Sequence, residues 1–330
     1  MLHWSIEKKI LELKYTWKIS RNASDTKTNL FVTVKEDSKS QGIGEAAPNV
    51  RYNETPEELE KQFDLFLSEH PEKISSLEEL SDMLNRIALP HALRFAIESA
   101  FIHYQCSKQN KTIYELLGLN KPTSIFTAYS VPIMETGKMK EFYLENNLSR
   151  FRFIKIKVNA ENAVDAIDYL SSFSDQPLLV DANEAFKDAD QCIFFFEKIK
   201  SKNIQFIEQP MPSTMVEESL YLKKHSPFPL FADESITDTA DFSLLKKMFD
   251  GINVKLMKAG GYLNGIRLLR EAKANNMKTM IGCMVETSLG ISSAMHLCSL
   301  ADYADLDSFL LLKNEPYNLI KENKGELKFS

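Results

Sequence analysis

Acidic side chains end three consecutive strand-like segments in the middle of the chain. They are Asp181 in VDANE, Glu208 in FIEQP and Asp233 in FADES. A single acid after a strand is usually a helix cap or a loop acceptor. Three acids at the same point of three successive units would crowd together, and their repulsion favours a bound cation. Oxygen ligands select hard ions, so we expect Mg²⁺, with Mn²⁺ as the alternative. Zinc is disfavoured because no histidine lies at a strand end.

Two lysines occupy the segments on either side of these acids. Lys157 is expected at the end of the strand in FIKIKVN, and Lys258 at the end of the strand in GINVKLMKAGG. A lone lysine is usually a solvated surface charge, but apolar residues flank both of these. Strand alternation points Lys155 and Lys157 to the same side. The order lysine, acid, acid, acid, lysine therefore places two ammonium groups across the expected metal from each other.

This arrangement suits removal of a proton from the carbon next to a carboxylate. A metal that binds the carboxylate stabilises the charge that develops on it. A lysine acts as a base only if its pKa falls, which a metal or a neighbouring ammonium such as Lys155 favours. With Lys157 on one face of the carbon and Lys258 on the other, a proton can leave one side and return on the other.

A regular period positions these residues. From about residue 125, strand-like and helix-like segments alternate, and the polar strand ends recur every 22 to 27 residues. This is the length of one βα unit. Eight such strands predict an α/β fold of the (β/α)8 type, with its active site at the carboxyl ends of the strands. The alternative is an open doubly wound sheet, which is disfavoured because no glycine-rich phosphate loop opens the repeat.

The first third of the chain has a different pattern. Strand-like runs cover residues 6–17 and 29–35, and QGIGEAAP at 41–48 looks like a turn that enters another strand. Three helix-like segments follow, and the first opens with Thr55-Pro56-Glu57-Glu58, a helix-start signal. Strands followed by helices predict an α+β domain.

Composition narrows the classes of function. The 330 residues are 44% hydrophobic and 26% charged, which fits one barrel and a smaller domain. The net charge of -6, without a basic stripe, argues against a nucleic-acid partner. Four cysteines without CxxC spacing, and a start that does not resemble a signal peptide, indicate a cytoplasmic protein. No apolar run is long enough to span a membrane, so no membrane partner is expected.

As an ordered set, these residues resemble the enolase superfamily, in its muconate-lactonizing subgroup. The motifs that carry the resemblance are KIK at 155–157, DAN at 181–183, FIEQP at 206–210, ADES at 232–235 and NVKLMKAGG at 253–261. The resemblance implies an α+β capping domain over residues 1–122 and a modified TIM-type barrel over residues 123–312. Residues 313–330 are expected to return to the capping domain.

The resemblance also implies roles for individual residues. The expected metal ligands are Asp181, Glu208 and Asp233, and the expected acid–base pair is Lys157 and Lys258. Lys155 is expected beside the substrate, and Asn183 and Glu234 beside the metal ligands. Glu286, near the seventh strand end, is expected to support Lys258 or the substrate.

Dipeptide epimerases of this subgroup carry Asp-x-Asp at the eighth strand, where it holds the substrate's α-ammonium group. Asp305-Leu306-Asp307 resembles this motif, and alternation places both carboxylates on one side. The alternative is an acidic loop before the buried run 309–312. Arg21 resembles a loop arginine that some Ala-Glu epimerases use for the glutamate side chain, and a simple exposed arginine is the alternative.

The sequence therefore predicts an isomerase, a Mg²⁺-dependent dipeptide epimerase. Its reaction is 1,1-proton transfer at the α-carbon of the C-terminal residue, with L-Ala-D/L-Glu as the candidate substrate. The alternative is an o-succinylbenzoate synthase or a cycloisomerase on the same scaffold, which has no ammonium to hold. A barrel that only binds a ligand would not need both lysines. The expected partner is a small dipeptide substrate, and the sequence leaves open whether the chain assembles into a homo-oligomer.

Overall fold

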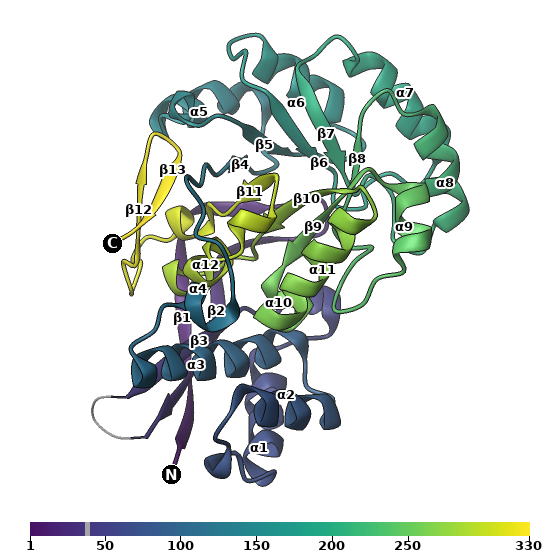
Figure 1. Cartoon of the computed structure of the whole chain (residues 1–330). Helices are drawn as coiled ribbons and strands as arrows, with labels where there is room; N and C mark the ends of the chain where they lie inside the picture. The colour runs from purple at the N-terminus through teal and green to yellow at the C-terminus, as the bar shows by residue number, and fades with distance from the viewer. Residues whose placement is uncertain (37–39) are drawn as a thin grey trace.

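An antiparallel sheet and four helices form the N-terminal part of the molecule, which we call the cap (Figure 1). The computed structural model describes residues 1–36 and 40–330. The cap elements are β1 (His3–Lys18), β2 (Ala23–Lys35), β3 (Gln41–Ala46), α1 (Pro56–Ser68), α2 (Leu77–Arg86), α3 (His91–Gln109) and α4 (Ile113–Leu117). The expected α+β architecture is confirmed.

Local signals start the helices of the cap. The Thr55 side chain accepts a hydrogen bond from Glu58 N at 3.2 Å, and Pro56 occupies the first position of α1. The Ser76 side chain does the same for Glu79 N at 3.2 Å before α2. Each of these two side chains accepts a hydrogen bond from a backbone N–H that the helix itself leaves unpaired, so the residues next to each helix set where it starts.

Helix α3 packs directly on β3 because two glycines allow the backbones to approach. A Cβ at Gly42 would lie 2.0 Å from Ala100 O, and a Cβ at Gly44 would lie 2.1 Å from Ala96 O. The segment expected to contain a turn is therefore a strand from Gln41 onward. Its glycines provide space for a helix rather than a bend in the chain.

Eight parallel strands form the barrel that follows the cap. The strands are β4 (Tyr129–Val131), β5 (Ile154–Lys157), β6 (Leu178–Asp181), β7 (Ile204–Glu208), β8 (Leu230–Ala232), β9 (Gly251–Lys255), β10 (Lys278–Gly282) and β11 (Tyr303–Asp305). They are ordered in sequence, and Ala128 N donates to Ala304 O at 3.0 Å to close the ring. The predicted modified (β/α)8 barrel is confirmed.

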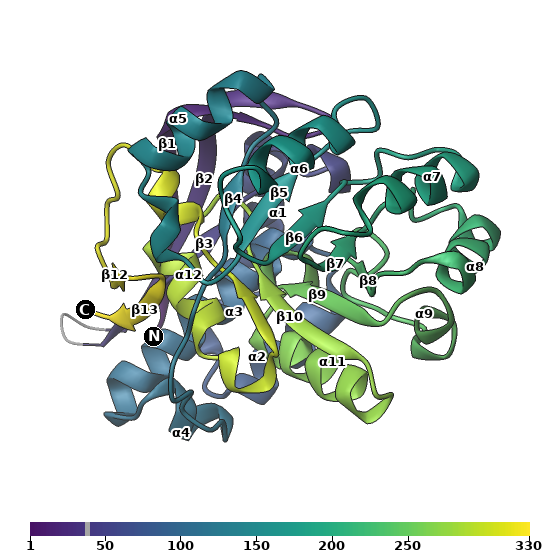
Figure 2. The ribbon, with the colours of Figure 1, turned by 90° about the horizontal axis from the view of Figure 1, so that it is seen from above.

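Helices cover the outside of this ring (Figure 2). They are α5 (Met139–Glu145), α6 (Ala163–Ser171), α7 (Ala189–Ile199), α8 (Val216–His225), α9 (Phe242–Met248), α11 (Tyr262–Ala274) and α12 (Ser288–Met295). The one-turn helix α10 (Leu256–Ala259) directly follows β9 and packs against α3 of the cap. Within the described residues, no helix is long and apolar enough to cross a membrane.

Two buried glutamates of the cap reach helix starts of the barrel, and we call these contacts the buried junction. Glu45 accepts from Thr287 N at 3.0 Å and from Gly290 N at 2.9 Å, at the start of α12. Glu98 accepts from Leu263 N at 3.1 Å, at the start of α11. Unpaired N–H groups of a helix start favour a carboxylate, so both contacts hold the cap on the barrel.

The end of the chain touches both parts of the molecule. Lys313 N donates to Glu12 O in the cap at 2.9 Å. The hairpin of β12 (Ile320–Asn323) and β13 (Glu326–Phe329) lies against the start of the barrel, where Leu327 N donates to Ile125 O at 2.8 Å. The division into residues 1–122, 123–312 and 313–330 stays a prediction.

Candidate active site

Residues of the cap and the barrel line a cavity of about 100 Å³ at the carboxyl ends of the strands. Arg21 and Lys27 line it from the cap, and Lys157, Asp233 and Asp305 line it from the barrel. A TIM-type barrel builds its active site at this end because the side chains of all its strand ends converge there. The strand register brings the expected residues to this place.

The three expected metal ligands are buried on neighbouring strands. Asp181 lies in register with Glu208, and Asp233 follows β8 directly. Asp181 Oδ1 accepts from the backbone N of Asn183 at 3.0 Å, and Glu208 Oε1 accepts from Asn253 Nδ2 at 2.8 Å. Burial, followed by repulsion from Asp181 and Asp233, raises the pKa of Glu208 to about 7.

Lys155 lies at the centre of this acidic cluster. Its Nζ is 2.9 Å from Asp181 Oδ2, 2.7 Å from Glu208 Oε2 and 2.8 Å from Asp305 Oδ2. Burial disfavours its charge, but these carboxylates together raise the pKa of Lys155 well above its usual value. Lys155 therefore stays an ammonium and joins the strands that end in Asp181 and Glu208 to the eighth strand.

The two expected acid–base lysines lie on opposite sides of the acids. Lys157 Nζ is 2.6 Å from Asp181 Oδ2 and lines the cavity. Lys258 Nζ pairs with Asp233 and donates to Ile236 O at 3.1 Å. Burial lowers the pKa of Lys258, although Asp233 opposes this effect. A lowered pKa is what a lysine needs to act as a base near neutral pH.

The expected position of Lys258 at a strand end is wrong. Strand β9 ends at Lys255, and Lys258 lies on the one-turn helix α10. The turn ends at Gly260, whose φ of 77° lies in the left-handed region that glycine adopts without strain. Lys258 is still directed at Asp233, because a single helical turn returns its side chain to the barrel mouth.

The carboxylates of Asp181, Glu208 and Asp233 are the kind of ligand that a magnesium ion prefers, although in this structure they form ion pairs with lysines. In the part of the chain that the structure describes, no three acidic, histidine or cysteine side chains surround a common point as ligands would. Glu208 Oε2 accepts no hydrogen bond there, although Lys155 Nζ lies 2.7 Å away. Three crowded carboxylates, one with an oxygen that accepts no hydrogen bond, form a donor set for a hard divalent ion.

Asp305 and Asp307 converge on one residue of the first barrel strand. Ser130 N donates to Asp307 Oδ2 at 2.6 Å, and Ser130 Oγ donates to Asp305 Oδ1 at 3.3 Å. Both aspartates are buried and line the cavity, unlike the residues of a solvated acidic loop. Burial and the neighbouring Asp305 raise the pKa of Asp307 to about 7, and Lys155, which pairs with Asp305, opposes this rise only in part.

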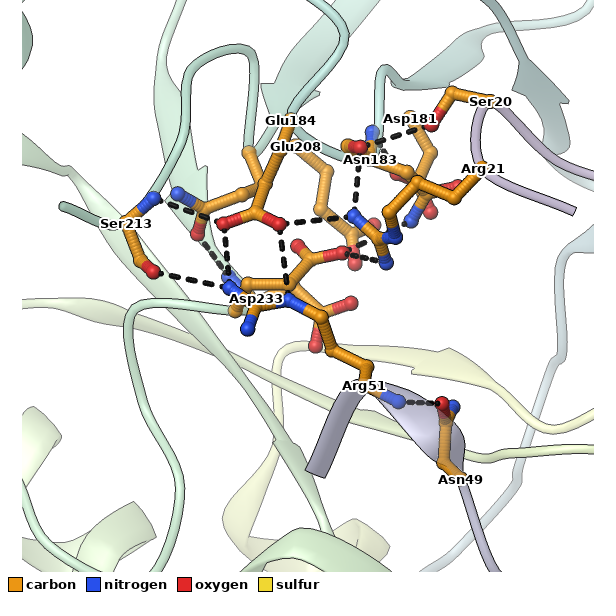
Figure 3. Close-up of polar contacts among 12 residues, drawn as sticks. Ser20, Arg21, Asn49, Arg51, Asp181, Asn183, Glu184, Glu208, Ser213 and Asp233 are labelled. Carbon is orange, nitrogen blue, oxygen red and sulfur yellow. Dashed lines mark hydrogen bonds and ion pairs between the residues drawn. The ribbon is translucent and has the colours of Figure 1, made fainter. Parts of the chain in front are cut away.

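Arg21 reaches the barrel and is already paired there (Figure 3). Its Nη1 donates to Asn183 O at 2.7 Å and to Glu184 Oε2 at 3.0 Å, and its Nη2 donates to Glu234 Oε1 at 2.7 Å. Arg51 approaches Glu184 from a second cap segment, with its Nη2 2.9 Å from Glu184 Oε1. We call Arg21, Arg51, Glu184 and Glu234 the arginine clasp.

Asn183, Glu234 and Glu286 lie around the site. Asn183 Nδ2 donates to Glu234 Oε1 at 3.4 Å, beside the expected metal ligands. Glu286 Oε1 accepts from Met284 N at 2.7 Å. Burial and the nearby Glu45 raise the pKa of Glu286 to about 8. The contacts of Glu286 place it toward the cap rather than against Lys258, and the roles of all three residues stay predictions.

The sequence pattern alone did not single out several residues of the site. Lys255 Nζ is 3.0 Å from Asp233 Oδ2, and Asn253 bonds Glu208. Both residues lie on β9, two positions apart, so their side chains point to the same side, the barrel interior. This two-residue period of a strand was the signal in the sequence that could have identified them. A Cβ at Gly282 would lie 2.4 Å from Asn253 Oδ1, so a glycine provides the space for that amide.

Residues 138–322 match the sequence model of the family described as enolase C-terminal domain-like. The chain belongs to the enolase superfamily. It is 35% identical over 331 residues to an L-Ala-D/L-amino acid epimerase of Pedosphaera parvula, covering 97% of this chain and 94% of that protein. These matches confirm the family that the motifs predicted.

Two further proteins show the extent of the similarity. An L-Ala-D/L-Glu epimerase of Bacteroides thetaiotaomicron is 29% identical over 321 residues, covering 96% of this chain and 82% of that protein. The crystal structure of a dipeptide epimerase from Cytophaga hutchinsonii, complexed with Mg and the dipeptide D-Ala-L-Val, is 23% identical with a TM-score of 0.89. It covers 99% of this chain and 92% of that chain. The second match supports the fold.

Proposed function

We propose that the protein is a Mg²⁺-dependent dipeptide epimerase that moves a proton at the α-carbon of the C-terminal residue. The observation that carries this proposal is the pair Asp305 and Asp307, buried at the wall of a cavity that Lys157 also lines. Two adjacent carboxylates suit the α-ammonium group of a peptide. The activities named for the relatives from Pedosphaera and Bacteroides agree with this proposal.

The acid–base roles are assigned to Lys157 and Lys258. A substrate carbon held between them would lose its proton to the neutral amine of one lysine and receive a proton from the ammonium group of the other. Asp181 and Asp233 hold the two Nζ atoms on opposite sides of the acidic cluster, which supports a separate role for each lysine. Epimerisation follows because the proton returns to the opposite face.

Asp181, Glu208 and Asp233 would hold Mg²⁺, with Mn²⁺ as a substitute. When bound, the ion supplies positive charge to the substrate carboxylate as negative charge develops there. Lys155, fixed by its carboxylates, adds a permanent positive charge beside Asp181 and Glu208. The Cytophaga epimerase was crystallised with Mg and a dipeptide, in agreement with this assignment.

The finer assignments rest on the relatives and on individual side chains. The Bacteroides relative supports L-Ala-D/L-Glu as a candidate substrate. For Arg21 to bind a glutamate side chain, its guanidinium must share or leave Glu184 and Glu234. The cytoplasmic location is supported by four free cysteines, and a homo-oligomer stays a prediction.

The rival function is an o-succinylbenzoate synthase or a cycloisomerase on the same scaffold. Incubation with a dipeptide library and Mg²⁺ in D2O separates the two functions. We expect deuterium at the α-carbon of the C-terminal residue of at least one dipeptide, with loss after chelation and recovery with Mg²⁺. No exchange with any dipeptide, together with turnover of the o-succinylbenzoate precursor, would establish the rival function.

Two substitutions test the acid–base roles directly. Lys157→Ala and Lys258→Ala should each lower kcat for epimerisation by about 10³-fold or more, because a positioned acid or base typically contributes 10²–10⁴-fold. Single-turnover exchange from the L and D dipeptides should identify which face each lysine serves. Near-normal turnover by either variant would show that the reaction does not need two bases.

A further inference from the structure

Five cationic side chains line the cavity, and four of them are paired with carboxylates. The paired cations are Arg21 with Glu234 at 2.7 Å, Arg51 with Glu184 at 2.9 Å, Lys157 with Asp181 at 2.6 Å and Lys255 with Asp233 at 3.0 Å. The fifth is Lys27. Across residues 1–36 and 40–330, its ammonium group has neither an ion pair nor a side-chain hydrogen bond.

Strand β2 directs Lys27 toward the wall of the cavity that Val285 also lines. Its cross-strand neighbour Leu11 packs in an apolar cluster with Val285, and Asn29, two residues along the same face, donates to Val285 O at 2.9 Å. Paired residues and residues two apart share one face of a sheet. Lys27 therefore faces the segment that follows β10, beside the barrel strand that ends in Asp305.

An ammonium group in this position is incompletely compensated. Lys27 is half-buried, and burial alone lowers its pKa. Removing a charge from water without a partner is unfavourable, and a carboxylate that arrives in the cavity would reverse that loss. Arg21 is less suited to this task, because Glu184 and Glu234 already neutralise its guanidinium.

We propose that Lys27 determines specificity by binding a side-chain carboxylate of the dipeptide. This inference rests on the proposed epimerase function and adds that the preferred substrates are acidic dipeptides. The carboxylate can belong to either residue of the dipeptide, since the chemistry at Lys27 is the same. Neutral and cationic dipeptides would leave Lys27 unpaired and bind less well.

The test compares each acidic dipeptide with its neutral amide. The kcat/KM for L-Ala-L-Glu is divided by that for L-Ala-L-Gln, and the same ratio is taken for L-Glu-L-Ala and L-Gln-L-Ala. We expect wild-type protein to favour the acid in one of the two pairs, which identifies the residue that Lys27 binds. Lys27→Met should lower that ratio by about 30-fold, and Lys27→Arg should retain most of it.

Two controls keep the test decisive. Taking the ratio within each variant removes the effect of incomplete folding. Lys35→Met, a change at the exposed end of the same strand, should leave the ratio unaltered. An unchanged ratio in Lys27→Met, or no acid preference in wild-type protein that epimerises neutral dipeptides, would overturn the role of Lys27 alone. Absence of exchange with every dipeptide would instead overturn the proposed function.

Discussion

The cap meets the barrel in two places that differ in burial and in the kind of contact. At the buried junction, Glu45 and Glu98 are 1% and 3% exposed and bond to backbone N–H groups. In the arginine clasp, the side chains of Arg21 and Arg51 are 33% and 35% exposed and bond mainly to carboxylates. Partly exposed ion pairs contribute little stability and weaken with salt, whereas buried bonds are costly to break.

The comparison indicates that the two contacts between the cap and the barrel have different roles. The buried junction fixes the position of the cap, because its bonds have no water to replace them. The arginine clasp holds only two cap segments, one around Arg21 and one around Arg51, over the cavity. We expect those segments to open for the substrate while the rest of the cap stays in place, as is usual for loops over active sites.

Removal of Glu45 should have the largest effect on stability. Glu45→Ala leaves Thr287 N and Gly290 N without their acceptor and removes one of the two hydrogen bonds of Asn29 Nδ2. We expect the free energy of unfolding to fall by about 3 kcal/mol, measured by urea denaturation. The exposed Glu78→Ala is the control and should change it little. A loss at Glu45 as small as at Glu78 would show that this junction does not fix the cap.

Glu98 should give the buried junction a pH dependence. Burial raises the pKa of Glu98 from its usual value of 4.5 to about 7 in the folded protein. Between these two pH values the folded protein keeps a proton that the unfolded chain releases. The contribution of Glu98 to stability is therefore fully present below about pH 4.5 and is lost as pH rises toward 7. The slope should be at most about 1.4 kcal/mol per pH unit.

Glu98→Gln tests this slope, because the amide oxygen can still accept from Leu263 N. Urea denaturation between pH 4.5 and pH 7 should show a flatter dependence in the variant than in wild-type protein. Glu78→Gln, at an exposed site, should follow wild-type protein. Parallel curves for wild type and Glu98→Gln would mean that Glu98 is ionised in both states.

Release of the arginine clasp should have the smallest effect on stability. Glu184→Gln weakens the bonds of both Arg21 and Arg51, and we expect the free energy of unfolding to change by about 1 kcal/mol or less. Amide hydrogen exchange in residues 19–23 and 49–53 should become faster, and added salt should have the same effect on wild-type protein. Exchange that spreads through α3 would contradict the division between the two contacts.

The sequence predicted the barrel and the meeting of polar strand ends at its mouth, because both follow from local pattern. The spacing of Lys157, Asp181 and Glu208 repeats with the βα unit, so the strand register alone brings them together. The departure of Lys258 from a strand end depends on one helical turn before Gly260, which a strand-like run does not reveal.

Contacts between distant parts of the chain could not be predicted in this way. Glu45 and Thr287 are 242 residues apart, and neither segment carries a signal of the other. The same holds for Arg51 with Glu184, whose residues resemble ordinary charged loop positions. The partner of a polar side chain depends on how the cap is placed on the barrel, and the placement follows from packing over many residues.

Closure of the barrel has a consequence for biosynthesis. The hydrogen bond between Ala128 and Ala304 that completes the ring can form only after Ala304 has been synthesised. At about 5–20 residues per second, the ribosome needs on the order of ten seconds or more to make the intervening chain. Until then the first barrel strand has an open edge in the nascent chain. Ser130 meets Asp305 and Asp307 only after the eighth strand leaves the exit tunnel, so that end of the cavity is assembled last.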